Sequence, residues 1–190
     1  MPALTQLTPL GVASLALLAE RPMHPYEMYQ LLMARSEDRL LKVRPGTLYH
    51  AVGRLSEHGL VDAVGTDREG NRPERTTYEI SQAGRRALTS RLEDMLAVPA
   101  NEYPEFPLAI AEAHNLPRGQ VLELLDRRLE ALVVRLLDLE HGERVVTGRR
   151  IEKKYWIDLC YQQTLLRADI GWIRSFQEDL RTGRIGWESP

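Results

Sequence analysis

The chain has 190 residues, of which 43% are hydrophobic and 27% charged, and its formal net charge is −2. This composition suits one or two globular domains and excludes a chain that is polycationic as a whole. The single cysteine, Cys160, rules out an intramolecular disulfide and fits a reducing compartment. The apolar run from Leu10 to Ala19 has no basic segment before it and is too short to span a bilayer. We therefore expect a cytoplasmic protein.

Three short helices are expected before residue 60. Thr8 is an N-cap residue followed by proline, so the first helix should run from Pro9 to about Ala19 with almost no polar side. Pro25 and Glu27 suit the first turn of a second helix, which should end near Arg35. The stretch VRPGTLYHAVGRLSEHGLV, residues 43–61, supplies the third helix, with proline near its start and glycine past its end.

The third helix has a thin apolar side and a small, polar, cationic front. Leu48, Val52 and Leu55 share one side, and no acid lies between Arg39 and Ser56. A cluster of positive charge without acids favours an anionic partner, and a merely solvated face is the alternative. The four cations of this cluster are Arg39, Lys42, Arg44 and Arg54.

The major groove of DNA admits one helix with small side chains near the groove floor, and this front fits it. We expect Thr47, His50 and Arg54 to meet base edges, with Gly53 allowing close approach. The residues expected at phosphates are Lys42 and Arg44, which precede the helix, and Tyr49 on its flank. For Tyr49 the alternative is a half-buried aromatic that closes the helix bundle, and both roles can hold together.

A hairpin and a fourth helix follow. Alternation predicts strands at 60–64 and 76–80, joined by a long polar tip. Ser81 then caps a helix with apolar residues at helical spacing, of which Leu88 is the first. The order of three helices, two strands and a helix predicts a winged helix-turn-helix domain over residues 1–97. The fold class is thus mainly α with a small β-hairpin.

Three prolines between Ala97 and Pro107 place a domain boundary there, and residues 98–190 read as a helical domain. Two long amphipathic helices are expected, the second from about Arg150 to Arg181, with HGERVVTG as the turn that folds them antiparallel. Their apolar stripes favour a second subunit as the covering surface, and a monomeric helical subdomain packed on the winged domain is the alternative. The predicted dimerisation residues are Leu122, Leu125, Leu129, Leu132, Leu136, Leu139, Leu159, Leu166, Ile170 and Ile173.

Several segments together resemble the PadR-like family of transcriptional regulators, specifically members with a long helical C-terminal region. These segments are HPYEMYQLL, GTLYHAVGRLSEHGLV, NRPERTTYEISQAGRRAL and YPEFPLAI, and the resemblance covers nearly the whole chain. It implies a winged-helix repressor that binds an inverted-repeat operator as a homodimer and is released by planar hydrophobic compounds. It also implies that Tyr49 and its neighbours contact DNA and that Arg72 and Pro73 form the wing tip.

The chain departs from the family pattern at three places: Pro25, His50 and the tip sequence Asn71-Arg72-Pro73-Glu74. His50 adds a candidate base contact. Glu74 would face phosphates unfavourably, so wing contacts are expected to rest on Arg68, Arg72 and Arg75.

Other functions are weaker interpretations. The sequence has no glycine-rich phosphate loop, no metal-ligand spacing and no nucleophile arrangement, so we expect neither an enzyme nor a cofactor or metal. A winged-helix module that binds only proteins is the alternative to a DNA-binding regulator. Aromatic residues of the C-terminal region are candidates for an effector pocket, with helix packing as their commoner role. The three that we name are Tyr155, Trp156 and Trp172.

Overall fold

The computed structural model describes residues 7–67 and 75–187. The chain divides into two compact units, Met1–Asn101 and Glu102–Pro190, and each has its own clusters of buried apolar side chains. The sequence predicts two domains, residues 1–97 and 98–190, and this exact boundary stays a prediction.

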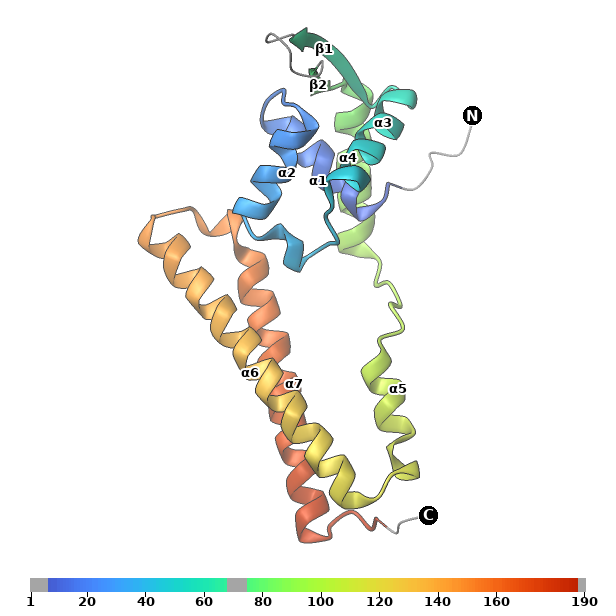
Figure 1. The fold of residues 1–190 in the computed structure, drawn as a ribbon, viewed down its shortest axis with the longest axis vertical. Helices are drawn as coiled ribbons and strands as arrows, with labels where there is room; N and C mark the ends of the chain where they lie inside the picture. The colour runs from blue at the N-terminus through green and yellow to red at the C-terminus, as the bar shows by residue number, and fades with distance from the viewer. Residues whose placement is uncertain (1–6, 68–74, 188–190) are drawn as a thin grey trace. The chain divides into compact units, whose positions relative to one another are not determined.

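The first unit has the order of elements that the sequence predicts, which confirms the winged helix-turn-helix (Figure 1). Thr8 caps the first helix by accepting the Gly11 N–H at 3.2 Å, and Ser81 caps the fourth by accepting the Gly84 N–H at 3.0 Å. A short 3-10 helix, η1 (Glu37–Arg39), precedes the third helix. The main elements are α1 (Pro9–Glu20), α2 (Pro25–Ala34), α3 (Pro45–Glu57), β1 (Val61–Asp67), β2 (Arg75–Ile80) and α4 (Gln82–Ala97).

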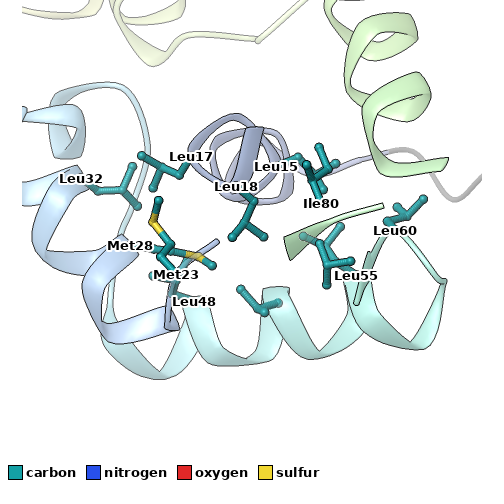
Figure 2. Packing of buried hydrophobic residues seen from close by; sticks show 12 residues of the cluster. Leu15, Leu17, Leu18, Met23, Met28, Leu32, Leu48, Leu55, Leu60 and Ile80 are labelled. Atoms are coloured by element: carbon teal, nitrogen blue, oxygen red, sulfur yellow. The ribbon is translucent and has the colours of Figure 1, made fainter. Parts of the chain in front are cut away.

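A single apolar core joins the helices of this unit (Figure 2). Leu15 and Leu18 of α1 are almost fully buried, and so are Leu48 and Val52 of α3. Each such side chain contributes about 1.5–3 kcal/mol relative to an exposed one. The apolar side of α3 is therefore held firmly, which leaves its opposite side at the surface.

The two strands of the wing are longer than the sequence predicts, and a third segment, at Met23, pairs with the second strand. β1 and β2 are antiparallel, with Val61 opposite Ile80 and Ala63 opposite Tyr78. Met23, in the link between α1 and α2, exchanges two backbone hydrogen bonds with Tyr78 at 3.0 and 3.1 Å. These bonds tie the base of the hairpin to the start of α2.

The base of the wing also packs tightly on α4 through Gly84. A Cβ atom at this position would lie 2.0 Å from the backbone oxygen of Leu60. The Ser81 hydroxyl joins the same two segments by donating a hydrogen bond to the Gly59 carbonyl at 2.7 Å. Only a glycine allows α4 to approach the end of α3 this closely.

The second unit contains α5 (Glu105–Ala111), the 3-10 helix η2 (Ala113–Asn115), α6 (Arg118–Gly148), the 3-10 helix η3 (Lys153–Tyr155) and α7 (Ile157–Thr182). The two long helices run side by side in opposite directions (Figure 1). None of the helices in the described part of the chain is long and apolar enough to cross a membrane.

The turn between the long helices lies later than predicted. Residues 141–148 continue α6, so the expected HGERVVTG turn is wrong, and α7 starts at Ile157 rather than near Arg150. Val146 explains the difference, because it packs on the cluster that contains Leu139 and Leu159 and so extends the apolar stripe. Arg150, with a φ of 57°, then stands just past the end of the helix.

The leucine seam is covered within one chain, which corrects the argument that it needs a second subunit. Six of the ten predicted dimerisation residues are buried, and the other four are half-buried in clusters shared by α6 and α7. Phe106 and Ile110 of α5 pack on one of these clusters. That these ten residues also form a subunit interface stays a prediction.

Two buried glutamines on α7 interrupt the seam, two heptads apart. Gln163 Nε2 donates to Glu143 at 2.8 Å, and Gln177 Nε2 donates to Asp126 at 2.7 Å. Arg167, four residues after the first glutamine, donates to Gln163 and to Glu140. Polar residues in an apolar seam favour the one register that satisfies them, so this pair of contacts fixes how α6 and α7 align.

Candidate nucleic-acid interface

The exposed side of α3 carries a row of small and polar residues. Gly46, His50, Gly53 and Glu57 follow one another at spacings of four, three and four, opposite the buried Leu48 and Leu55. Glu57 completes this row and is exposed; it was not predicted, because it lies beyond the acid-free stretch. Its carboxylate could accept a hydrogen bond from a cytosine amino group.

Three cations beside this row have no acidic partner in the described residues. Lys42, Arg44 and Arg54 are all exposed, and none forms an ion pair there. Elsewhere in the same unit cations are paired: Arg35 donates to Glu20 at 2.6 and 2.8 Å, and Arg21 pairs with Glu27. The Arg35 hydrogen bond lowers the pKa of the Glu20 carboxyl. The cations near α3 thus differ from those of α1 and α2 in having no ion-pair partner among the described residues.

Arg39 does not belong to this surface, although it is part of the acid-free stretch. Its Nη1 donates to the carbonyls of Arg35 at 3.1 Å and Ser36 at 2.6 Å. The side chain is half-buried and closes the C-terminal end of α2. The cluster of four cations in the sequence therefore becomes a group of three in the structure.

Thr47 is exposed but already engaged at the start of α3. Its hydroxyl donates to the Arg44 carbonyl at 2.8 Å and accepts the Arg44 N–H at 3.2 Å. A hydroxyl has one hydrogen to donate, so Thr47 offers an outside group mainly its methyl and a remaining lone pair.

The two glycines of the row have open space around them. A Cβ atom at Gly46 or Gly53 would meet nothing within 4 Å. Glycine inside a helix costs about 0.5–1 kcal/mol relative to alanine. Packing inside the chain does not explain Gly53, whereas the close approach of an outside molecule would.

Tyr49 stands on the flank of the row and is 46% exposed. The ring meets that of His24 edge to face, with centroids 5.7 Å apart and planes at 72°. Its two neighbours along the helix are the buried Leu48 and the exposed His50. Tyr49 is thus partly packed and partly exposed, which suits both roles considered for it, and its contact with a phosphate stays a prediction.

The predicted wing contacts lie almost entirely outside the described residues. Arg68, Arg72 and Glu74 fall in the segment 68–74. Arg75 is described through its backbone, which pairs with Asp67 at the end of the hairpin.

The three aromatic residues predicted for an effector are not brought together. Trp156 is the N-cap residue of α7, and Trp172 lies sixteen positions further on, which is about 24 Å along a helix. Tyr155 is largely exposed, and the Trp156 indole N–H donates to the Ile151 carbonyl at 2.9 Å. These two residues therefore belong to the connection between α6 and α7.

Trp172 belongs instead to an aromatic cluster at the other end of the second unit. Its ring is stacked on Phe176 at 5.3 Å and meets Phe106 edge-on at 6.4 Å. The Arg128 guanidinium lies 3.6 Å from the centre of the Phe106 ring, and its buried Nε has no hydrogen-bond partner among the described residues. Arg128 was not predicted, because its role depends on α5 folding back onto α6.

Across residues 7–67 and 75–187, no group of three or more His, Cys, Asp or Glu residues could hold a metal ion. Cys160 is half-buried on α7.

Residues 15–90 match the model of the Transcriptional regulator PadR-like family. No sequence among the curated proteins matches the chain.

Several solved structures have a similar fold. One is Bacillus subtilis PadR in complex with operator DNA, with 17% sequence identity, a TM-score of 0.76, and coverage of 90% of this chain and 97% of that chain. Another is the same protein in complex with p-coumaric acid, with 16% sequence identity, a TM-score of 0.75, and coverage of 90% of this chain and 98% of that chain. A third is the Vibrio cholerae virulence activator AphA, with 20% sequence identity, a TM-score of 0.71, and coverage of 91% of this chain and 98% of that chain.

These likenesses show that both units share the fold of their neighbours, from the winged helix to the long C-terminal helices. The family match covers α3 and both strands of the wing. The resemblance found in the sequence is therefore confirmed over residues 15–90, which match the PadR-like family of transcriptional regulators.

Proposed function

We propose that this protein is a sequence-specific DNA-binding repressor that binds an inverted repeat as a homodimer. The observation that carries the proposal is the front of α3, where open glycines stand beside cations without acidic partners. A similar fold has been solved with operator DNA for Bacillus subtilis PadR. The protein needs no catalytic residue or cofactor for this role, and it would act in the cytoplasm, beside the DNA.

The residues divide by chemistry into two groups. Lys42 and Arg44 precede α3 and would meet phosphates, together with the Tyr49 hydroxyl. His50 and Arg54 would reach base edges, because an imidazole and a guanidinium can both donate in the major groove. Thr47 would serve mainly to hold the start of α3, with its methyl available to a thymine. Contacts from Arg68, Arg72 and Arg75 remain part of the proposal.

Homodimers would form through a second apolar stripe on α7. Tyr161, Leu165 and Trp172 are about half or more exposed and recur at spacings of four and seven on one side of the helix. Exposed apolar patches of this kind mark interaction surfaces. A two-fold dimer would present two copies of α3, which is why the operator should be an inverted repeat.

Selection from a pool of random duplexes tests the proposal directly. The protein should enrich an inverted repeat and should lower the expression of a reporter gene placed behind it. With the enriched duplex, Lys42→Gln should weaken binding to all sequences alike and reduce the slope of log affinity against log salt by about one unit. Arg54→Ala should cost roughly 1–3 kcal/mol on the enriched duplex and less on random DNA.

A protein that binds only other proteins would give a different result. It would retain no duplex, and its interactions would lack the steep salt dependence of phosphate contacts. Enrichment of an asymmetric single site would contradict the dimeric arrangement, and a reporter that rises with the protein would indicate an activator.

Gly53→Ala should separate stability from binding. The substitution should raise the free energy of unfolding by about 0.5–1 kcal/mol, because a helix-interior glycine is removed without a clash. It should weaken binding to the enriched duplex by roughly the 1–3 kcal/mol of one good base contact, since the new methyl stands where DNA approaches. Thermal unfolding and DNA titration measure the two effects.

Gly171→Ala on α7 is the matched control for this variant. Gly171 is also in a helix with nothing within 4 Å of an added Cβ. It should gain similar stability and bind DNA like the wild type. If Gly53→Ala binds equally well, DNA does not approach the front of α3 closely.

Leu165→Glu should disrupt the dimer. A carboxylate would be placed in an apolar subunit contact, and its desolvation would oppose association. Sedimentation should show monomers at concentrations where the wild type is dimeric. Thr164→Glu, on the neighbouring exposed position, adds the same charge on another side of α7 and should remain dimeric. A wild-type monomer at all concentrations would refute the dimer.

A planar hydrophobic effector completes the proposal, with Trp172 retained from the three predicted residues. Trp172 lies in the cluster with Phe106 and Phe176, near the Arg128 cation, which could pair with a carboxylate. p-Coumaric acid, bound in a solved structure of Bacillus subtilis PadR, is a suitable probe. It should quench the fluorescence of Trp172 and bind less tightly when the protein is saturated with DNA.

The Trp172→Phe variant controls for the other two tryptophans, and it should lose most of the quenching. Equal ligand affinity with and without DNA would show that the compound does not regulate DNA binding.

A further inference from the structure

His24 connects the start of α2 to the exposed side of α3. It is the N-cap residue of α2, and its Nδ1 accepts the backbone N–H of Tyr26 at 3.1 Å. The same ring meets Tyr49 edge to face, with ring centroids 5.7 Å apart. One half-buried imidazole therefore makes two different contacts, a hydrogen bond within its own helix and a ring contact with the next one.

The hydrogen bond fixes the imidazole ring in space. A ring nitrogen that accepts an N–H carries no proton, so the neutral ring holds its proton on Nε2. The Met23 backbone, just before His24, is held by its two hydrogen bonds to Tyr78. The ring that Tyr49 meets is thus anchored both by the cap and by the wing.

Tyr49 would have several orientations without such a contact. It is exposed on the flank of a helix, where side chains commonly change rotamer on the picosecond to nanosecond timescale. The position of its hydroxyl depends on which rotamer it adopts. A ring packed edge to face on an anchored imidazole keeps one orientation, and so keeps the hydroxyl in one place before any partner arrives.

We propose that His24 is a positioning residue for DNA binding, which holds the Tyr49 ring so that its hydroxyl donates to a DNA phosphate. This inference rests on the proposed function and adds a residue outside α3 to it. His24 acts through Tyr49: the imidazole orients the phenol, and the phenol makes the contact. The link also explains why the N-cap of α2 is a ring rather than a smaller polar side chain.

The two contacts of His24 can be separated by substitution. His24→Asn keeps a side chain that caps helices well but removes the ring. His24→Phe keeps a ring for Tyr49 to pack against and removes the cap. Tyr49→Phe keeps its own ring and removes the hydroxyl. These variants distinguish a cap that only stabilises the fold from a ring that positions Tyr49.

The test is a double-mutant cycle on the affinity for the duplex enriched by selection, with thermal unfolding measured for every variant. His24→Asn should unfold like the wild type and bind the duplex roughly two- to tenfold more weakly, as expected for loss of one aromatic contact. In the Tyr49→Phe background the same substitution should change the affinity little. His24→Phe should lose stability but bind nearly as well as the wild type, measured well below its unfolding transition.

Three results would overturn the inference. Either His24→Asn binds like the wild type, or its loss of affinity is as large in the Tyr49→Phe background as in the wild-type background. His24→Phe binding as weakly as His24→Asn would likewise overturn it, because the ring would then not matter. A wild-type protein that binds no duplex at all is a separate outcome and refutes the proposed function itself.

Discussion

The exposed face of α3 depends on the burial of its other face. Leu48, Val52 and Leu55 are at most 5% exposed and pack in the core that joins α1, α2 and the wing. At about 1.5–3 kcal/mol for each fully buried side chain, these three contacts are comparable to the whole net stability of many domains. Rotating α3 about its axis would expose them, so the fold holds the row from Gly46 to Glu57 at the surface with little freedom.

The exposed face, in contrast, contributes little to folding. Gly53 lowers helix stability, and Lys42, Arg44 and Arg54 form no ion pairs with the described residues. A face that costs stability and leaves charges uncompensated is typical of a surface kept for a partner. Stability and recognition are thus placed on opposite sides of one helix, which allows the residues of the row to vary without loss of the fold.

Sequence reasoning succeeded where a local signal was strong and failed where tertiary contacts decided. Proline and cap residues gave the starts of α1, α2 and α4, and apolar spacing gave the buried side of α3. The turn at 141–148 was wrong because Val146 extends the apolar stripe of α6. The bridge from Met23 to Tyr78 carries no sequence signal. The engagement of the Thr47 hydroxyl also depends on backbone geometry that spacing does not reveal.

The second unit follows a different logic, because its best apolar stripe is used inside the chain. The seam and the two buried glutamines fix the register of α6 against α7. A ligand that slid one helix along the other would have to break these contacts. In the proposed dimer, an effector would therefore act by changing how two such pairs associate, rather than by rearranging one pair. The aromatic cluster around Trp172 is suited to this, since Trp172 lies both in the cluster and on the exposed stripe of α7. A compound bound there would alter the subunit contact directly, and the spacing of the two copies of α3 would follow.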